Sequence, residues 1–128
     1  MTARIAQTYI AAVFLGLGGW ALFGPGSVIE LGFTESYREN SFTTRFIMAC
    51  LGAQAVLFGF MALVVEWKAW AFLAFAVLLL PFFWFNYHFH YVEPVLTRYG
   101  MIDFAGNLTM FIAALIGWRA AKAGERRA

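Results

Sequence analysis

Residues 81–94 read Pro-Phe-Phe-Trp-Phe-Asn-Tyr-His-Phe-His-Tyr-Val-Glu-Pro, and this stretch decides how the rest of the chain is interpreted. Before Asn86 it is apolar and aromatic, whereas from Asn86 onward polar side chains alternate with rings. Such a change is typical of a membrane helix that leaves the hydrocarbon through a belt of aromatic side chains. The stretch therefore predicts a transmembrane helix that ends in a small polar cluster.

The composition extends this interpretation to the whole chain of 128 residues, which has room for one domain. Hydrophobic residues make up 62% and charged residues 12%, against about 45–50% and about 25% in soluble proteins. A soluble fold could not cover so much apolar surface. The formal net charge of +2 is too small to indicate nucleic-acid binding, and the single cysteine, Cys50, excludes an internal disulfide.

Four apolar runs are each about long enough to cross a bilayer as a helix. Together they predict an all-α fold in one domain, residues 1–128: a polytopic bundle of four transmembrane helices. Ser27 and Glu30 have capping-box spacing and predict a short interfacial helix after the first span. The spans are expected at about 5–23, 42–65, 69–91 and 99–121, and the short helix at about 28–32.

Small residues at helical spacing predict close contacts between these helices. Gly52 and Gly59 are seven residues apart and share one face, and Ala12 and Gly16 form a second small pair. Gln54 lies in the middle of the second span on another face. A lone amide at that depth is expected to hydrogen-bond to a neighbouring helix.

Basic residues are distributed unequally between the two sides of the predicted bundle. By the positive-inside rule, the side with more of them faces the cytoplasm, so both termini are expected there. The protein is then a multi-pass protein of the bacterial inner (cytoplasmic) membrane. One side carries Arg4, Lys68, Arg119, Lys122, Arg126 and Arg127, and the other carries Arg38, Arg45 and Arg98.

Polar residues gather at the predicted outer ends of the last three spans. If the third span stays helical, Asn86, His90 and Glu93 share one face at spacings i, i+4 and i+7, and His88 points elsewhere. A metal could be bound by His88, His90 and Glu93 only if the segment were extended, because a helix sets the two rings about 200° apart. Neither a metal nor another cofactor is therefore predicted, although a quinone or a lipid is possible.

Arg45 and Asp103 each lie just inside the predicted outer boundary, where an unpaired charge is costly, so we expect them to face each other. Asn107 follows Asp103 by one turn on the same face. The cluster is then either a structural clamp that fixes the helix register or a polar pocket for a ligand. The candidate ligand-binding residues are Arg45, Asn86, His90, Glu93, Asp103 and Asn107.

Three motifs carry a resemblance to a known family. They are Phe23-Gly24-Pro25 at the end of the first span, Ile29-Glu30-Leu31-Gly32-Phe33 after it, and Arg45 at the start of a glycine-rich second span. With the basic tail, they resemble the small four-helix bacterial membrane proteins called DoxX-like. The resemblance implies the same four-helix fold. Many members have no assigned activity, and some resemble subunits linked to quinone-dependent sulfur oxidation.

We recognise no arrangement of catalytic residues and therefore favour a role that is not enzymatic. The expected function is that of an accessory or assembly subunit, or of a homo-oligomer. The expected partners are membrane lipids, other membrane subunits or further copies of the chain, and not nucleic acid. The alternative is a binder of, or an enzyme for, a small lipophilic molecule such as a quinone or a lipid, held in a polar pocket at the outer end.

Overall fold

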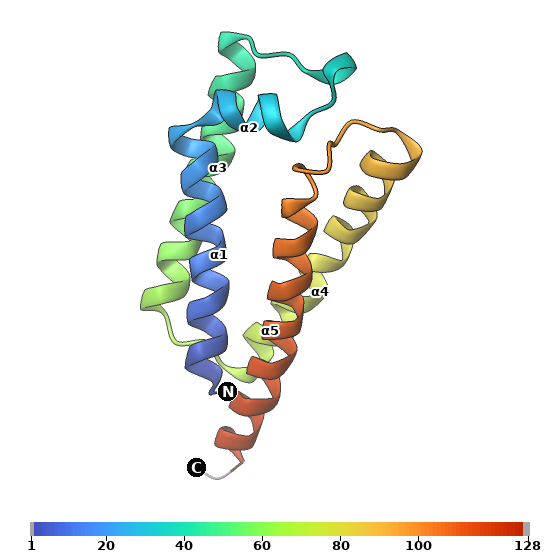
Figure 1. The fold of residues 1–128 in the computed structure, drawn as a ribbon. Helices are drawn as coiled ribbons and strands as arrows, with labels where there is room; N and C mark the ends of the chain where they lie inside the picture. The colour runs from blue at the N-terminus through green and yellow to red at the C-terminus, as the bar shows by residue number, and fades with distance from the viewer. Residues whose placement is uncertain (1, 127–128) are drawn as a thin grey trace.

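The computed structural model describes residues 2–126, and this part of the chain is all-helical with no strand (Figure 1). Four of the helices are long and apolar enough to cross a membrane, which makes the chain a small multi-pass membrane protein. The long helices are Ala3–Phe23 (α1), Phe42–Val64 (α3), Ala69–Tyr87 (α4) and Ile102–Glu125 (α5). The short ones are Pro25–Gly32 (α2), a 3-10 turn at Glu35–Tyr37 (η1) and a π-helical turn at His88–Val92 (η2).

The long helices form two pairs that diverge. α1 packs on α3 and also on α5, and α4 packs on α5, whereas the backbones of α3 and α4 lie apart although the two helices follow each other in the chain. Both termini lie at one end of the bundle, called here the terminal end, and α2 lies at the opposite loop end (Figure 1). The pair α1/α3 and the pair α4/α5 approach each other near the terminal end and separate toward the loop end.

Glycine residues allow α1 and α3 to pack with their backbones in contact. A Cβ atom on Gly52 would overlap the backbone nitrogen of Leu22, and one on Gly59 would lie 3.0 Å from the carbonyl oxygen of Ala11. The shared face predicted for Gly52 and Gly59 is therefore confirmed. Gly16, in contrast, has nothing within 4 Å of its Cβ position and does not make a close helix contact.

Gln7 joins α1 to the turn between α3 and α4. This amide is 2% exposed, and its Nε2 donates to the carbonyl oxygens of Ala62 and Val65 while its Oε1 accepts from the backbone nitrogen of Trp67 at 3.2 Å. The last carbonyls of a helix have no partner within that helix. Gln7, which lies on a neighbouring span, supplies the missing hydrogen-bond donor for two such carbonyls.

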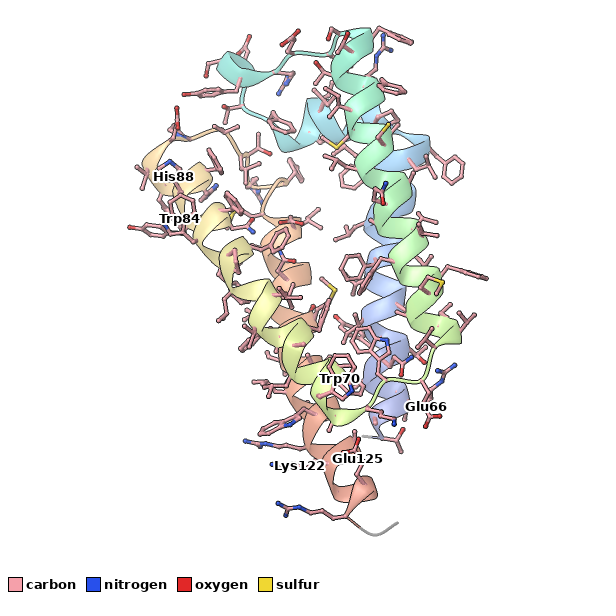
Figure 2. All side chains as sticks on the ribbon, turned by 180° about the vertical axis from the view of Figure 1, so that it is seen from behind. Glu66, Trp70, Trp84, His88, Lys122 and Glu125 are labelled. Carbon is pink, nitrogen blue, oxygen red and sulfur yellow. The ribbon has the colours of Figure 1, made fainter. Side chains whose placement is uncertain are left out.

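The C-terminal end of α5 caps the first residue of α4 in a similar way. Glu125 accepts a hydrogen bond from the backbone nitrogen of Ala69 at 3.0 Å, at the start of α4, where no side chain of α4 itself provides a cap. Figure 2 shows Glu125 at the terminal end, beside Lys122. The fourth span thus remains helical through Glu125 instead of ending near residue 121 as predicted. Arg127, one of the basic residues on which the predicted orientation depends, lies outside the described residues.

Helix α2 begins differently from the predicted capping box. Its first residue is Pro25, and the Ser27 hydroxyl donates to the carbonyl of Gly24 at 2.7 Å without capping the helix. Glu30 instead accepts from the amide of Asn40 at 2.9 Å. Proline is favoured at the first helical position, because its missing N–H is not needed there, so the helix starts earlier and Ser27 falls inside its first turn.

Besides the packing of α1 on α5, two sets of contacts hold the pairs together. Toward the terminal end, the ring of Phe75 in α4 lies 5.9 Å from that of Phe58 in α3 and 6.0 Å from that of Phe14 in α1, measured between ring centres. At the loop end, the backbone nitrogen of Thr34 donates to the carbonyl oxygen of Val95 at 2.8 Å. Between these contacts the backbone of α3 stays apart from α4 and α5, while α1 remains packed on α5.

Candidate ligand pocket and outer polar cluster

A pocket of about 380 Å³ lies between the two helix pairs. Its walls are almost entirely apolar, and Phe14, Phe58 and Phe75 line it on the side of the terminal end. Leu51 of α3 and Leu78 of α4 also line it, and both are exposed because the backbones of these two helices lie apart. The pocket therefore follows directly from the divergence of the helix pairs.

Asp103 and Asn107 line the loop end of this pocket, and Asn86 of α4 is hydrogen-bonded to Asp103; these three residues are called here the polar trio. Asn86 and Asn107 are 2% and 5% exposed, and each donates from Nδ2 to the same carboxylate oxygen of Asp103, Oδ2, at 3.1 and 2.9 Å. Asp103 and Asn107 belong to the pocket lining. The predicted common face of Asp103 and Asn107 is confirmed; the two side chains are hydrogen-bonded there, and α4 contributes Asn86 to the cluster.

Asp103 receives no cation from the described part of the chain. The predicted ion pair with Arg45 is wrong: the Arg45 side chain is exposed, and its Nε donates to the carbonyl of Ser41 at 3.4 Å. The reason is the order of the helices, since α1 lies between α3, which carries Arg45, and α5, which carries Asp103. The carboxylate is stabilised instead by two amides and by its place in the first turn of α5, where unpaired N–H groups favour a negative charge.

The trio keeps acceptors that the described residues do not use. Both amides bond to Oδ2 of Asp103, so Oδ1 has no hydrogen-bond partner there. The Oδ1 atom of Asn86 is fully buried and also lacks a partner among residues 2–126. Asp103 is exposed, so its Oδ1 is accessible, whereas a buried polar atom such as Oδ1 of Asn86 is rarely left unpaired. The site is thus rich in acceptors and poor in donors.

The other predicted residues lie in the π-helical turn that follows α4. There the backbone nitrogen of Glu93 donates to the carbonyl of His88 at 2.8 Å, which brings residues five apart above one another. His88 Nε2 lies 3.7 Å from Glu93 Oε2, and the His88 ring stacks on Trp84 with centres 5.1 Å apart, at the loop end of α4 (Figure 2). The predicted common face of Asn86, His90 and Glu93 is therefore wrong, because it assumed an ordinary α-helical repeat.

This turn does not assemble a metal site. Nδ1 of His90 is 3.1 Å from the carbonyl of Leu96, and Glu93 is contacted by His88 and, at 3.5 Å, by the hydroxyl of Tyr37. Within residues 2–126, no three His, Cys, Asp or Glu side chains come together in a way that could hold a metal ion. The observed contacts of His88, His90 and Glu93 lie instead within the π-helical turn and with the segments next to it.

Two glutamines behave differently from what the sequence indicated. The role of Gln7 was not predicted, although an amide one turn inside the first span is the kind of residue that hydrogen-bonds to a neighbouring helix. Gln54 was expected to make such a bond, but it is exposed and forms no hydrogen bond with another described residue. It follows Gly52 by two residues, which turns it about 200° away from α1.

The six predicted ligand-binding residues thus fall into separate groups. Asp103 and Asn107 line the pocket and Asn86 is bonded to Asp103, whereas His90 lies in the π-helical turn, Glu93 follows that turn directly, and Arg45 lies at the start of α3. No family model matches the chain, and no curated protein or solved structure matches it. The pocket and its polar trio are the candidate site on geometry alone.

Proposed function

We propose that the protein binds a lipophilic molecule whose polar head donates hydrogen bonds. The apolar part of this ligand occupies the pocket between the helix pairs, and its head lies against Asp103. The observation that carries the proposal is the free Oδ1 of that carboxylate at the end of an apolar pocket of about 380 Å³. Small-molecule sites commonly have about this volume, with few polar groups among apolar walls.

The chemistry of the trio narrows the class of ligand. An ionised carboxylate can only accept hydrogen bonds. An oxidised quinone presents carbonyl oxygens, which are also acceptors, and therefore fits this site poorly. A quinol, a hydroxyl-bearing lipid or a lipophilic amine supplies the donor that Asp103 lacks, and a protonated amine would also balance its charge.

The proposal is tested by purifying the protein in a mild detergent and measuring the bound small molecules by native mass spectrometry. We expect one ligand per chain in the wild type. Asp103→Asn places an amide donor where the site needs an acceptor, and it should reduce ligand retention by about tenfold, the equivalent of one hydrogen bond to a charged group. The ligand's mass and its reaction with an amine-specific reagent distinguish a hydroxyl head from an amine head.

Two tryptophan variants of α4 form a matched pair for the same measurement. Leu78 lines the pocket and Leu80 does not, and both side chains are exposed. Leu78→Trp should fill the entrance and remove the ligand, whereas Leu80→Trp should retain it. Equal retention in the wild type, in both tryptophan variants and in Asp103→Asn would show that the pocket is not the binding site.

An accessory or assembly role is the second candidate function. It is favoured by α3, of whose membrane-spanning window only 17% is buried, against 28% for each of the other three spans. A span so little covered by its own chain has surface available for another protein. Recovery of a stoichiometric partner chain during the same gentle purification would support this role, and the DoxX-like resemblance is compatible with either function.

We also infer that both termini face the cytoplasm of a bacterial cell. The support is the larger number of basic residues at the terminal end. In a Cys50→Ala background, a cysteine at Lys122 should react with a membrane-impermeant maleimide only after the cells are opened. A cysteine at Arg38 should react in intact cells after the outer membrane is removed. The reverse pattern would contradict the orientation.

A further inference from the structure

One face of α3 carries a regular seam of residues that nothing in the described chain covers. The residues recur at alternating intervals of four and three, the heptad spacing of helices that pack in parallel coiled coils. Every side chain of the seam is exposed. The seam consists of Thr43, Ile47, Cys50, Gln54, Leu57, Met61 and Val64.

Gln54 gives this seam a feature that contact with lipid does not explain. It lies at least ten residues from either end of α3, which places its amide about 15 Å from both ends of the helix. At that depth the surroundings are hydrocarbon, which offers no hydrogen-bond partner. Among residues 2–126, no group bonds to this amide either. An exposed amide in mid-span is stabilised when it meets a polar group on another helix.

We propose that two copies of the chain associate through this seam, with Gln54 of one copy hydrogen-bonded to Gln54 of the other. Two copies inserted in the same direction present their α3 helices in parallel, related by a two-fold axis along the membrane normal. Such an axis brings a core position of the seam next to the same position of the partner. An amide has both a donor and an acceptor, so two glutamines facing each other can exchange two hydrogen bonds.

The heptad register supports a second copy as the occupant. Ile47, Gln54 and Met61 are seven residues apart and take the a positions, while Cys50 and Leu57 take the d positions. A single polar residue at an a position fixes the register of a parallel pair, which is the part that Gln54 would play. The interface uses the face of α3 turned away from α1 and leaves the ligand pocket open, so it is independent of the proposed ligand.

The native cysteine provides a direct test, because the seam places Cys50 beside its own copy. The full-length protein is reconstituted in phospholipid vesicles at low density and treated with copper phenanthroline, which oxidises two nearby thiols to a disulfide. We expect a covalent dimer on a non-reducing gel. Gln54→Leu should slow its formation by about tenfold, the effect of losing interhelical amide bonds. Gln54→Asn, which keeps the amide, should restore much of the rate.

A control separates this interface from random collisions in the membrane. Leu80 is an exposed residue in the middle of α4, and in Cys50→Ala/Leu80→Cys its thiol should form a disulfide at least tenfold more slowly than Cys50 does. The proposal is overturned if Cys50 forms no dimer, if Gln54→Leu forms it as fast as the wild type, or if the α4 cysteine is equally reactive. Because Gln54 is exposed, its substitution leaves the packing within the chain intact.

Discussion

Replacing Gly52 by alanine tests the packing of α1 on α3. The added Cβ would overlap the backbone nitrogen of Leu22 and lie 2.7 Å from the Gly18 carbonyl oxygen, whereas ordinary contacts are at least 3.4 Å. These are backbone atoms of a helix, so no side-chain rotation relieves the overlap, and the helices must separate by about 1 Å. Overpacking of this kind costs up to about 3 kcal/mol. The higher helix propensity of alanine returns about 1 kcal/mol, so the free energy of unfolding should fall by about 2 kcal/mol.

Two adjacent glycines of α1 provide the matched control. A Cβ atom on Gly18 would lie 2.7 Å from the Cβ of Ala55, whereas one on Gly19 would meet nothing within 4 Å. Gly18→Ala should therefore destabilise the protein, while Gly19→Ala should be neutral or stabilising by up to about 1 kcal/mol. The substitutions are chemically identical and one residue apart, so only their direction relative to α3 differs.

The measurement is reversible unfolding in mixed micelles of dodecyl maltoside and sodium dodecyl sulfate, followed by circular dichroism. The free energy of unfolding is compared for the wild type and the three alanine variants. The reasoning is refuted if Gly52→Ala stays within about 0.5 kcal/mol of the wild type. It is equally refuted if Gly19→Ala loses as much stability as Gly18→Ala.

Three further substitutions can be followed in the same unfolding assay. Gln7→Leu removes the side-chain hydrogen bonds to Ala62, Val65 and Trp67 at the α3–α4 turn and should cost about 3 kcal/mol, because it leaves buried backbone groups unpaired; an unchanged stability would mean that these backbone groups find other partners. Glu125→Ala removes the acceptor for the Ala69 N–H and should cost about 1 kcal/mol, the usual value of a helix cap, whereas no loss would show that water replaces it. Arg45→Met should change the free energy of unfolding by less than about 0.5 kcal/mol, since Arg45 does not pair with Asp103. A loss of about 2 kcal/mol or more would instead indicate that the two residues form the predicted ion pair.

Much of the fold could be predicted from the sequence, because length and apolar composition identify membrane spans directly. The pairing of the helices could not. α4 is apolar around its whole circumference, so its sequence indicates no preferred face, and a short connection between α3 and α4 suggests close packing of their backbones, which the structure lacks. Gly52 and Gly59 do mark the α1–α3 interface correctly, because only small residues allow that approach.

The candidate site was predicted in part. Asp103 and Asn107 were placed together because an i, i+4 spacing on a helix survives in any packing arrangement. The expected Arg45–Asp103 pair depended instead on which helices are neighbours, and α1 separates theirs. The position of Glu93 depended on a π-helical turn, which needs one extra residue per turn and leaves no clear mark in a sequence of aromatic residues. The pocket itself results from the divergence of two helix pairs and has no local signal.

The most direct test of the central claim is to identify what fills the pocket in a living membrane. The photoreactive amino acid benzoylphenylalanine is placed at Leu78, which lines the pocket, or at Leu80, which does not, and the cells are irradiated before the adducts are identified by mass spectrometry. If the pocket binds the proposed ligand, we expect a defined lipophilic adduct with a hydroxyl or amine head at position 78. At position 80 we expect only adducts with ordinary membrane phospholipid. The same phospholipid adducts at both positions would contradict it.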